Sequence, residues 1–341
     1  MPDLTSLKNI SWRVPVAVVL LAAAGLCGYY YGKPSGSSTA ASLLLDNDAA
    51  SSYQYLRPLL AVQVPKALGN TEFASLNAKI AAIVAAEPKG TLKRYAYYIK
   101  DMTNTLWTGV NETDQYDPGS LLKLAFAVSV YKQAESDPGI LYRQLTYTQS
   151  IASIQSNFSD ALPTNLVVGQ SYSTAYLIKD MLVNSDNGAK DLLVTSLDPD
   201  VINQTFKDLS ITLPASTDYP GFTITPQEFS RFLRILYYGT YDIQWKDSNQ
   251  LLQYLAQSTY TDGLVAGVPR DVPVAHKYGE QLATTNGQPS SIELSDCGIV
   301  YDPKNPYLIC VMTEGTNVTD LQDFIAKVSA ATYQEAQIDF K

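Results

Sequence analysis

The chain has 341 residues, 46% of them hydrophobic, which is enough to build a large buried core and excludes disorder as its main state. Its formal net charge of −9 argues against nucleic acid as a partner, because phosphate binding needs a basic surface. With one histidine, His276, the chain cannot build a zinc site from two or three imidazoles, and we expect neither a metal nor another cofactor.

An apolar stretch near the N-terminus predicts one transmembrane helix at residues 14–32. The stretch is long enough to span a bilayer, and Lys8 and Arg13 precede it on the side expected to be cytoplasmic. We therefore expect a membrane-anchored protein whose folded part is extracytoplasmic, in the periplasm or on the cell surface. A cleaved signal peptide is the alternative, since Ala22–Ala24 offers a small-residue cleavage pattern.

The rest of the chain divides by composition. A run rich in serine, glycine and proline begins at Lys33 and has no periodicity, as is typical of a flexible tether. The expected organisation is a cytoplasmic segment at 1–13, the anchor at 14–32, a linker at 33–69 and a folded domain at 70–341 with a helical subdomain at about 119–260.

The first half of the folded domain mixes helix and strand patterns. Apolar residues at helical spacing predict a helix from Thr71 to Ala86. The elements expected next are a strand hairpin at 95–100 and 106–110, a helix from 118 to about 137, and helices at 174–183 and 189–196. The clearest helix start is the capping box formed by Thr225 and Glu228, and Gly239 is expected to end this helix.

The pattern changes to strands near the C-terminus. Strands are expected at 272–278, 292–301 and 307–313, followed by a closing helix at about 319–333. Because strands lie at both ends of the domain, we expect an α+β fold: an antiparallel sheet formed from both chain ends, with flanking helices and an all-helical insertion.

Two cysteines flank the turn between the last two predicted strands. Cys297 and Cys310 lie symmetrically about this turn and face each other in a simple hairpin. They could form a disulfide, which would persist outside the cytoplasm. Two buried free thiols are the alternative interpretation.

Three short motifs contain residues suited to acyl transfer. Ser120 and Lys123 are spaced i, i+3 and therefore lie on one face of a helical turn. A serine hydroxyl becomes a nucleophile when a base takes its proton, and burial or a second cation such as Lys277 could lower the pKa of Lys123 enough for that task. The other two motifs are the expected turn Ser185-Asp186-Asn187 and the strand segment Lys277-Tyr278-Gly279.

In this order, the three motifs resemble those of the serine β-lactamase and penicillin-binding protein superfamily. The surroundings resemble its class A β-lactamase branch, with YDPGSLLKL around Ser120, IKDMLVNSDNGAKDLL around Ser185 and GLVAGVPRDVPVAHKYGE through Lys277. The resemblance runs from about Asn70 to the C-terminus. It implies a β-lactamase or D,D-peptidase-like fold.

The resemblance also implies a reaction, acyl transfer through an acyl-enzyme at Ser120, on a β-lactam or on a peptide ending in D-alanine. Lys123 would take the Ser120 proton, and Ser185, supported by Lys277, would pass a proton to the leaving nitrogen. The backbone N–H groups of Ser120 and Glu280 would form the oxyanion hole. The residues expected to bind substrate are Asn187, Tyr278, Gly279 and Glu280.

The sequence departs from the class A pattern where the deacylating base is expected. No glutamate lies between Glu135 and Glu228, and Asp208 is the carboxylate nearest the expected place. Without a base to activate water, the acyl-enzyme should persist, as in a penicillin-binding protein. The alternatives to a β-lactamase-like hydrolase are therefore a D,D-peptidase acting on cell-wall peptides and a non-catalytic domain that binds peptidoglycan or a partner.

Further departures concern the substrate carboxylate. Tyr278 stands where the family has threonine or serine, whose hydroxyl binds that carboxylate, and no arginine follows Arg270 to assist. Lys277 would bind the anion alone, or the substrate differs. His276 should point to the opposite face of the sheet from Lys277, because successive strand residues alternate, and we expect a structural role for it.

Overall fold

A computed structural model describes residues 53–57, 73–104, 106–156, 164–213, 221–285, 288–338 and 340. The predicted anchor at 14–32 lies outside these residues. Among the residues that are described, no helix combines the length and the apolar composition needed to cross a bilayer.

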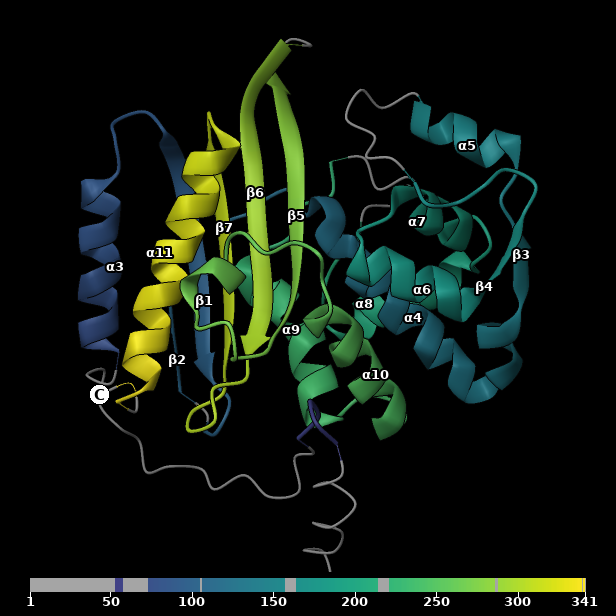
Figure 1. The fold of residues 1–341 in the computed structure, drawn as a ribbon, viewed down its shortest axis with the longest axis horizontal. Helices are drawn as coiled ribbons and strands as arrows, with labels where there is room; N and C mark the ends of the chain where they lie inside the picture. Colours follow the sequence, from purple (N-terminus) through teal and green to yellow (C-terminus); the bar gives the residue numbers. More distant parts are fainter. Residues whose placement is uncertain are drawn as a thin grey trace, which may run out of the picture. The chain divides into compact units, whose positions relative to one another are not determined.

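A five-stranded antiparallel sheet forms one side of the folded unit, with the strand order β2-β1-β7-β6-β5 (Figure 1). Its strands are β1 (Leu92–Asp101), β2 (Trp107–Val110), β5 (Val274–Thr285), β6 (Gln288–Val300) and β7 (Tyr307–Gly315). Because β1 pairs with β7, the sheet joins the two ends of the domain. The predicted α+β arrangement is therefore confirmed.

Two helices cover the outer face of the sheet. They are α3 (Ala74–Ala86) and α11 (Val318–Ala336), which Figure 1 shows side by side against the sheet. Ile80 of α3 and Phe324 of α11 are buried in one apolar cluster with Ile309 of β7. Burial of this apolar area stabilises the outer layer.

Helices fill most of the chain between β2 and β5. The last two α-helices of this segment pack against the strands of the sheet, and the others lie farther from it (Figure 1). The helices of this segment are η2 (Gly119–Leu121), α4 (Leu122–Ser136), η3 (Pro138–Tyr142), α5 (Gln149–Ser156), α6 (Thr174–Val183), α7 (Asn187–Val194), α8 (Pro199–Asp208), α9 (Pro226–Tyr238) and α10 (Trp245–Ala256), with η4 (Val265–Gly267) leading back to the sheet. A two-stranded ribbon of β3 (Gln144–Thr146) and β4 (Ser171–Ser173) lies among them, so the prediction of an all-helical insertion is wrong in this detail.

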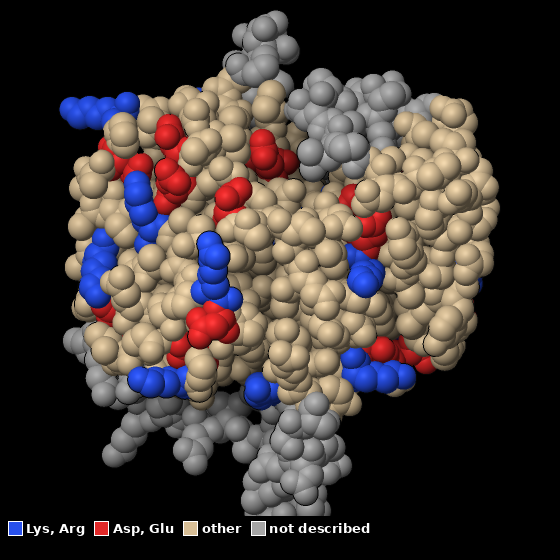
Figure 2. All heavy atoms as spheres, viewed as in Figure 1, with Lys and Arg blue, Asp and Glu red and all other residues tan. Residues whose placement is uncertain are grey.

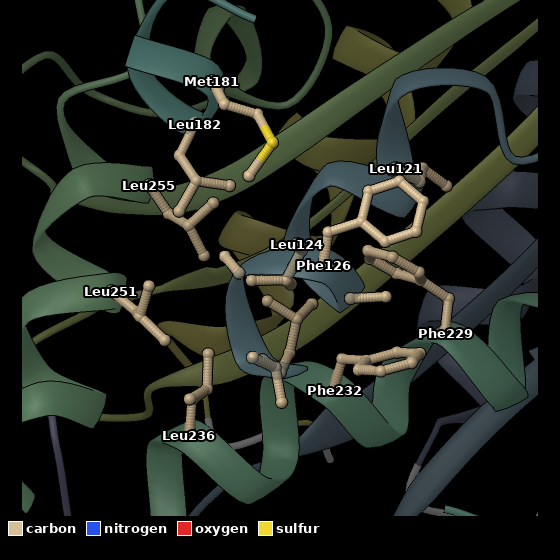
Figure 3. Packing of buried hydrophobic residues seen from close by; sticks show 14 of the residues in the cluster. Leu121, Leu124, Phe126, Met181, Leu182, Phe229, Phe232, Leu236, Leu251 and Leu255 are labelled. Carbon is tan, nitrogen blue, oxygen red and sulfur yellow. The ribbon is translucent and has the colours of Figure 1, made fainter. Parts of the chain in front are cut away.

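Helix α4 forms the centre of this helical layer. Figure 3 shows Leu124 and Phe126 of α4 among apolar side chains from neighbouring helices, including Phe232 of α9 and Leu255 of α10. Since α4 begins at Leu122, the same helix that anchors the core also carries Lys123. The core thereby fixes the position of a candidate catalytic side chain.

The boundaries of α9 follow its sequence signals. Thr225 and Glu228 form the predicted capping box, in which each side chain accepts a hydrogen bond from the other residue's backbone N–H. Gly239 ends the helix with a φ of 58°, in the left-handed region that glycine adopts without strain.

Strands β6 and β7 place Cys297 directly opposite Cys310, and the two buried cysteines form a disulfide. Of the two interpretations of the sequence, the disulfide is the one observed. On the described part of the surface in Figure 2, acidic and basic side chains are interspersed and form no continuous basic patch.

Candidate active site

The turn that carries Ser120 is pressed against the edge strand β5. A Cβ on Gly279 would lie 2.3 Å from the carbonyl oxygen of Pro118, and one on Gly119 would lie 2.8 Å from that of Glu280. Gly119 has a φ of 47°, so both its backbone and its surroundings favour glycine. The segments of Ser120 and Glu280, which are expected to supply the oxyanion hole, therefore lie in contact.

Lys123 is almost completely buried and has three hydrogen-bond partners. Its Nζ lies 2.5 Å from the carbonyl oxygen of Ser185, 2.6 Å from Oδ1 of Asn187 and 3.1 Å from Oγ of Ser185. The first two partners can only accept, whereas a hydroxyl can also donate. The site therefore suits both forms of Lys123: the ammonium, which donates to all three oxygens, and the neutral amine, whose lone pair can face the Ser185 hydroxyl.

Ser185 is held in an unusual backbone conformation by the residue that follows it. Its φ is 55°, which is rare for a residue with a side chain. The buried carboxylate of Asp186 accepts hydrogen bonds from Thr164 Oγ1 and from the backbone N–H groups of Asn165 and Ala189, at 2.7 to 2.8 Å. Asp186 therefore braces the turn and directs Ser185 toward the two lysines.

Lys277 approaches Ser185 from β5. It is fully buried, and its Nζ donates to Oγ of Ser185 at 2.9 Å and to the carbonyl oxygen of Tyr278 at 2.9 Å. The same ammonium lies 4.2 Å from the centroid of the Tyr278 ring, in a cation–π contact. Ser185 Oγ is therefore shared by both lysines.

Burial changes the proton affinity of both lysines. It lowers the pKa of Lys123 well below its ordinary value, and the neighbouring Lys277 ammonium lowers it further. Burial also lowers the pKa of Lys277 to about 7, against the opposing effect of the Asp296 carboxylate. A lysine whose pKa lies near 7 can gain and lose a proton at physiological pH, which a lysine with an ordinary pKa cannot.

Hydrogen bonds and one cation–π contact join five of the eight predicted site residues in one network: Lys123, Ser185, Asn187, Lys277 and Tyr278. Gly279 instead lies against the turn that carries Ser120. Ser120 lies beside this network on its turn, but within the described residues no hydrogen bond joins its hydroxyl to Lys123. Glu280 is exposed at the edge of the site and contacts Gly119 through its backbone.

Two further side chains lie away from this network. Asp208 pairs with Lys132 and Tyr241, and Lys132 is about 14 Å along α4 from Lys123 at 1.5 Å per residue. Asp208 therefore does not stand in for the missing glutamate. His276 points to the other face of the sheet, as predicted, where its Nδ1 lies 2.8 Å from Oδ1 of the buried Asp296.

Sequence reasoning missed Tyr260, which stacks on Tyr278 with ring centroids 3.9 Å apart. No motif marks Tyr260, because it lies in an irregular segment 18 positions before its partner. Within the described ranges, no group of histidine, cysteine and carboxylate side chains is arranged to hold a metal ion.

Several solved structures share this fold. A β-lactamase from Xanthomonas campestris pv. campestris is 22% identical, with 77% of this chain and 98% of that chain covered and a TM-score of 0.63. A class A β-lactamase from Bacteroides cellulosilyticus is 21% identical, with 78% and 98% covered and a TM-score of 0.63. PBP-A is 17% identical, with 84% and 100% covered and a TM-score of 0.63.

A variant of PBP-A, solved as an acyl-enzyme complex with penicillin G, is 18% identical, with 77% and 96% covered and a TM-score of 0.62. No curated protein sequence matches this chain. The family model described as "Beta-lactamase enzyme family" matches residues 75–336, which include all three motifs. The chain therefore belongs to the β-lactamase enzyme family.

Proposed function

We propose that the chain is a serine hydrolase whose Ser120 is acylated by β-lactams. The observation that supports this most strongly is the pair of buried lysines on Ser185, beside the turn of Ser120. Structural ion networks also bury lysines, but here both contact one hydroxyl and neither has a carboxylate within hydrogen-bond distance among the described residues. This arrangement suits proton transfer rather than charge pairing.

In the proposed reaction, neutral Lys123 turns its lone pair from Ser185 to Ser120 and takes the hydroxyl proton. Ser120 Oγ then bonds to the lactam carbonyl carbon, and the carbonyl oxygen gains negative charge beside the N–H groups of Ser120 and Glu280. When the C–N bond breaks, Ser185 gives its proton to the nitrogen and regains one from Lys123. Lys123 ends neutral, and the acyl group remains as an ester on Ser120.

The fate of this ester separates the candidate functions. No glutamate lies between Glu135 and Glu228, and Asp208 is bound by Lys132, which lies about two and a half turns along α4 from Lys123. These observations favour slow deacylation of the Ser120 ester. The second candidate function is therefore a penicillin-binding D,D-peptidase. The PBP-A variant trapped with penicillin G belongs to the same fold and is consistent with this possibility.

The test follows the ester and its turnover in one sample. The protein is mixed with penicillin G, and intact mass is recorded over time, with Ser120→Ala as the control; nitrocefin hydrolysis is measured in parallel. Rapid nitrocefin turnover supports a β-lactamase, and a persistent adduct supports a penicillin-binding protein. Absence of both adduct and turnover with several β-lactams contradicts both and leaves the non-catalytic domain.

We also propose that the catalytic domain is extracytoplasmic and anchored through residues 14–32. The apolar composition of that segment and the Cys297–Cys310 disulfide, which an oxidising compartment would preserve, support the proposal. The test is to express the full chain and a chain that lacks residues 1–32, and to fractionate the cells. Recovery of both forms in the cytosolic fraction would contradict it.

A further inference from the structure

The aromatic ring of Tyr278 covers the ammonium of Lys277. Lys277 Nζ contacts Ser185 Oγ, the Tyr278 carbonyl oxygen and the face of the Tyr278 ring. Two of its three N–H groups donate to the two oxygens, and the ring face lies beside the ammonium. Lys277 is fully buried, so a substrate anion could reach its charge only after the ring moves.

The ring is held in place from both sides. Tyr260 stacks on it with an interplanar angle of 16° and a centroid separation of 3.9 Å, and the Lys277 ammonium lies 4.2 Å from its centroid. Stacked aromatic pairs contribute stabilisation beyond the area they bury. Moving the ring would also remove the cation–π contact with Lys277.

The neighbouring strands supply no other positive charge. Between Lys277 and Lys304, a stretch that contains most of β5 and all of β6, the sequence has no lysine or arginine. A carboxylate placed beside Lys277 would therefore meet the aromatic face of Tyr278 and no second cation from these strands.

We propose that the site selects an acyl donor whose group beside Lys277 is uncharged, such as an ester, an amide or an aromatic ring, and that Tyr278 determines this specificity. The inference rests on the proposed acylation of Ser120 and adds the class of substrate. It concerns binding at one position of the donor and leaves the proton transfers unchanged.

The experiment compares two donors that differ only in that charge: penicillin G and its methyl ester. The rate of Ser120 acylation by each is followed by intact mass in the wild type, Tyr278→Thr, Tyr278→Phe and Tyr142→Thr. Tyr278→Phe keeps the ring, and Tyr142→Thr makes the same change at a side chain that is 77% exposed. The intrinsic reactivity of the ester is common to all variants, so the ester-to-acid ratio isolates the protein's contribution.

We expect the wild type, Tyr278→Phe and Tyr142→Thr to acylate faster with the ester, and Tyr278→Thr to lower the ester-to-acid ratio by at least about tenfold, or about 1.4 kcal/mol. A wild type that prefers the acid overturns the inference, even if Tyr278→Thr does not fold. A folded Tyr278→Thr with the wild-type ratio also overturns it. If neither donor acylates Ser120 in the wild type, the proposed function itself fails.

Discussion

Replacing Gly279 with alanine perturbs the contact that positions Ser120. The added Cβ would lie 2.3 Å from the carbonyl oxygen of Pro118 and 3.0 Å from the backbone nitrogen of Leu121. The shorter distance is about 1 Å less than ordinary contact, and both atoms are backbone, so no side chain can rotate away. The turn must therefore retreat from β5 and carry Ser120 away from Glu280.

A misplacement of about 1 Å at reacting groups can lower a rate by roughly 100-fold, and overpacking costs about 1–3 kcal/mol of stability. We expect Gly279→Ala to fold, with acylation by penicillin G slower by that factor. Gly139→Ala is the control, since its Cβ would meet only the Asp137 side chain, at 3.2 Å. Fluorescent penicillin labelling gives the rate and urea denaturation gives the stability. Labelling of Gly279→Ala within a few-fold of the wild type would refute the reasoning.

Two further predictions concern the buried charges. Because burial lowers the pKa of Lys277 to about 7, the unfolded state binds more protons than the folded state above that pH, and the free energy of unfolding should rise from pH 7 to pH 9. In urea denaturation, Lys277→Met should show a smaller rise in the free energy of unfolding over this pH range. Lys123 and Lys100, whose pKa values are also lowered, should account for the rise that remains. An unchanged rise in Lys277→Met would contradict the lowered pKa of Lys277. Asp186→Ala leaves three hydrogen-bond donors, one of them on the buried Ala189, without their acceptor. It should cost about 2–4 kcal/mol, against about 1 kcal/mol for the exposed N-cap control Asp198→Ala. Equal losses in the two variants would show that Asp186 is an ordinary cap.

Much of the fold could be predicted because its signals are local. The capping box at Thr225 defined the start of α9, and the helix at 174–183 was predicted with its observed boundaries. Helices α8 and α10 were missed. Asp198 caps α8, which begins at Pro199, whereas α10 follows Gln244, whose side chain makes no capping hydrogen bond.

The three motifs of the candidate site could be recognised in the sequence, but the contacts among their residues could not. Ser120, Lys123, Ser185 and Lys277 were recognisable because each motif is only a few residues long, and a resemblance to a known family ordered them. The stacking of Tyr260 on Tyr278 depends on tertiary packing, which leaves no spacing in the sequence. The contact between Asp208 and Lys132 could not be predicted for the same reason, since Lys132 lies 76 positions earlier on another helix.

The central claim is that Lys123 activates Ser120 as the nucleophile. The most direct measurement is the mass of the peptide that contains Ser120 after brief exposure to penicillin G, in the wild type, Ser120→Ala and Lys123→Met. We predict a penicilloyl adduct on Ser120 in the wild type and none in either variant while both remain folded. An adduct on another residue, or undiminished labelling of Lys123→Met, would contradict the claim.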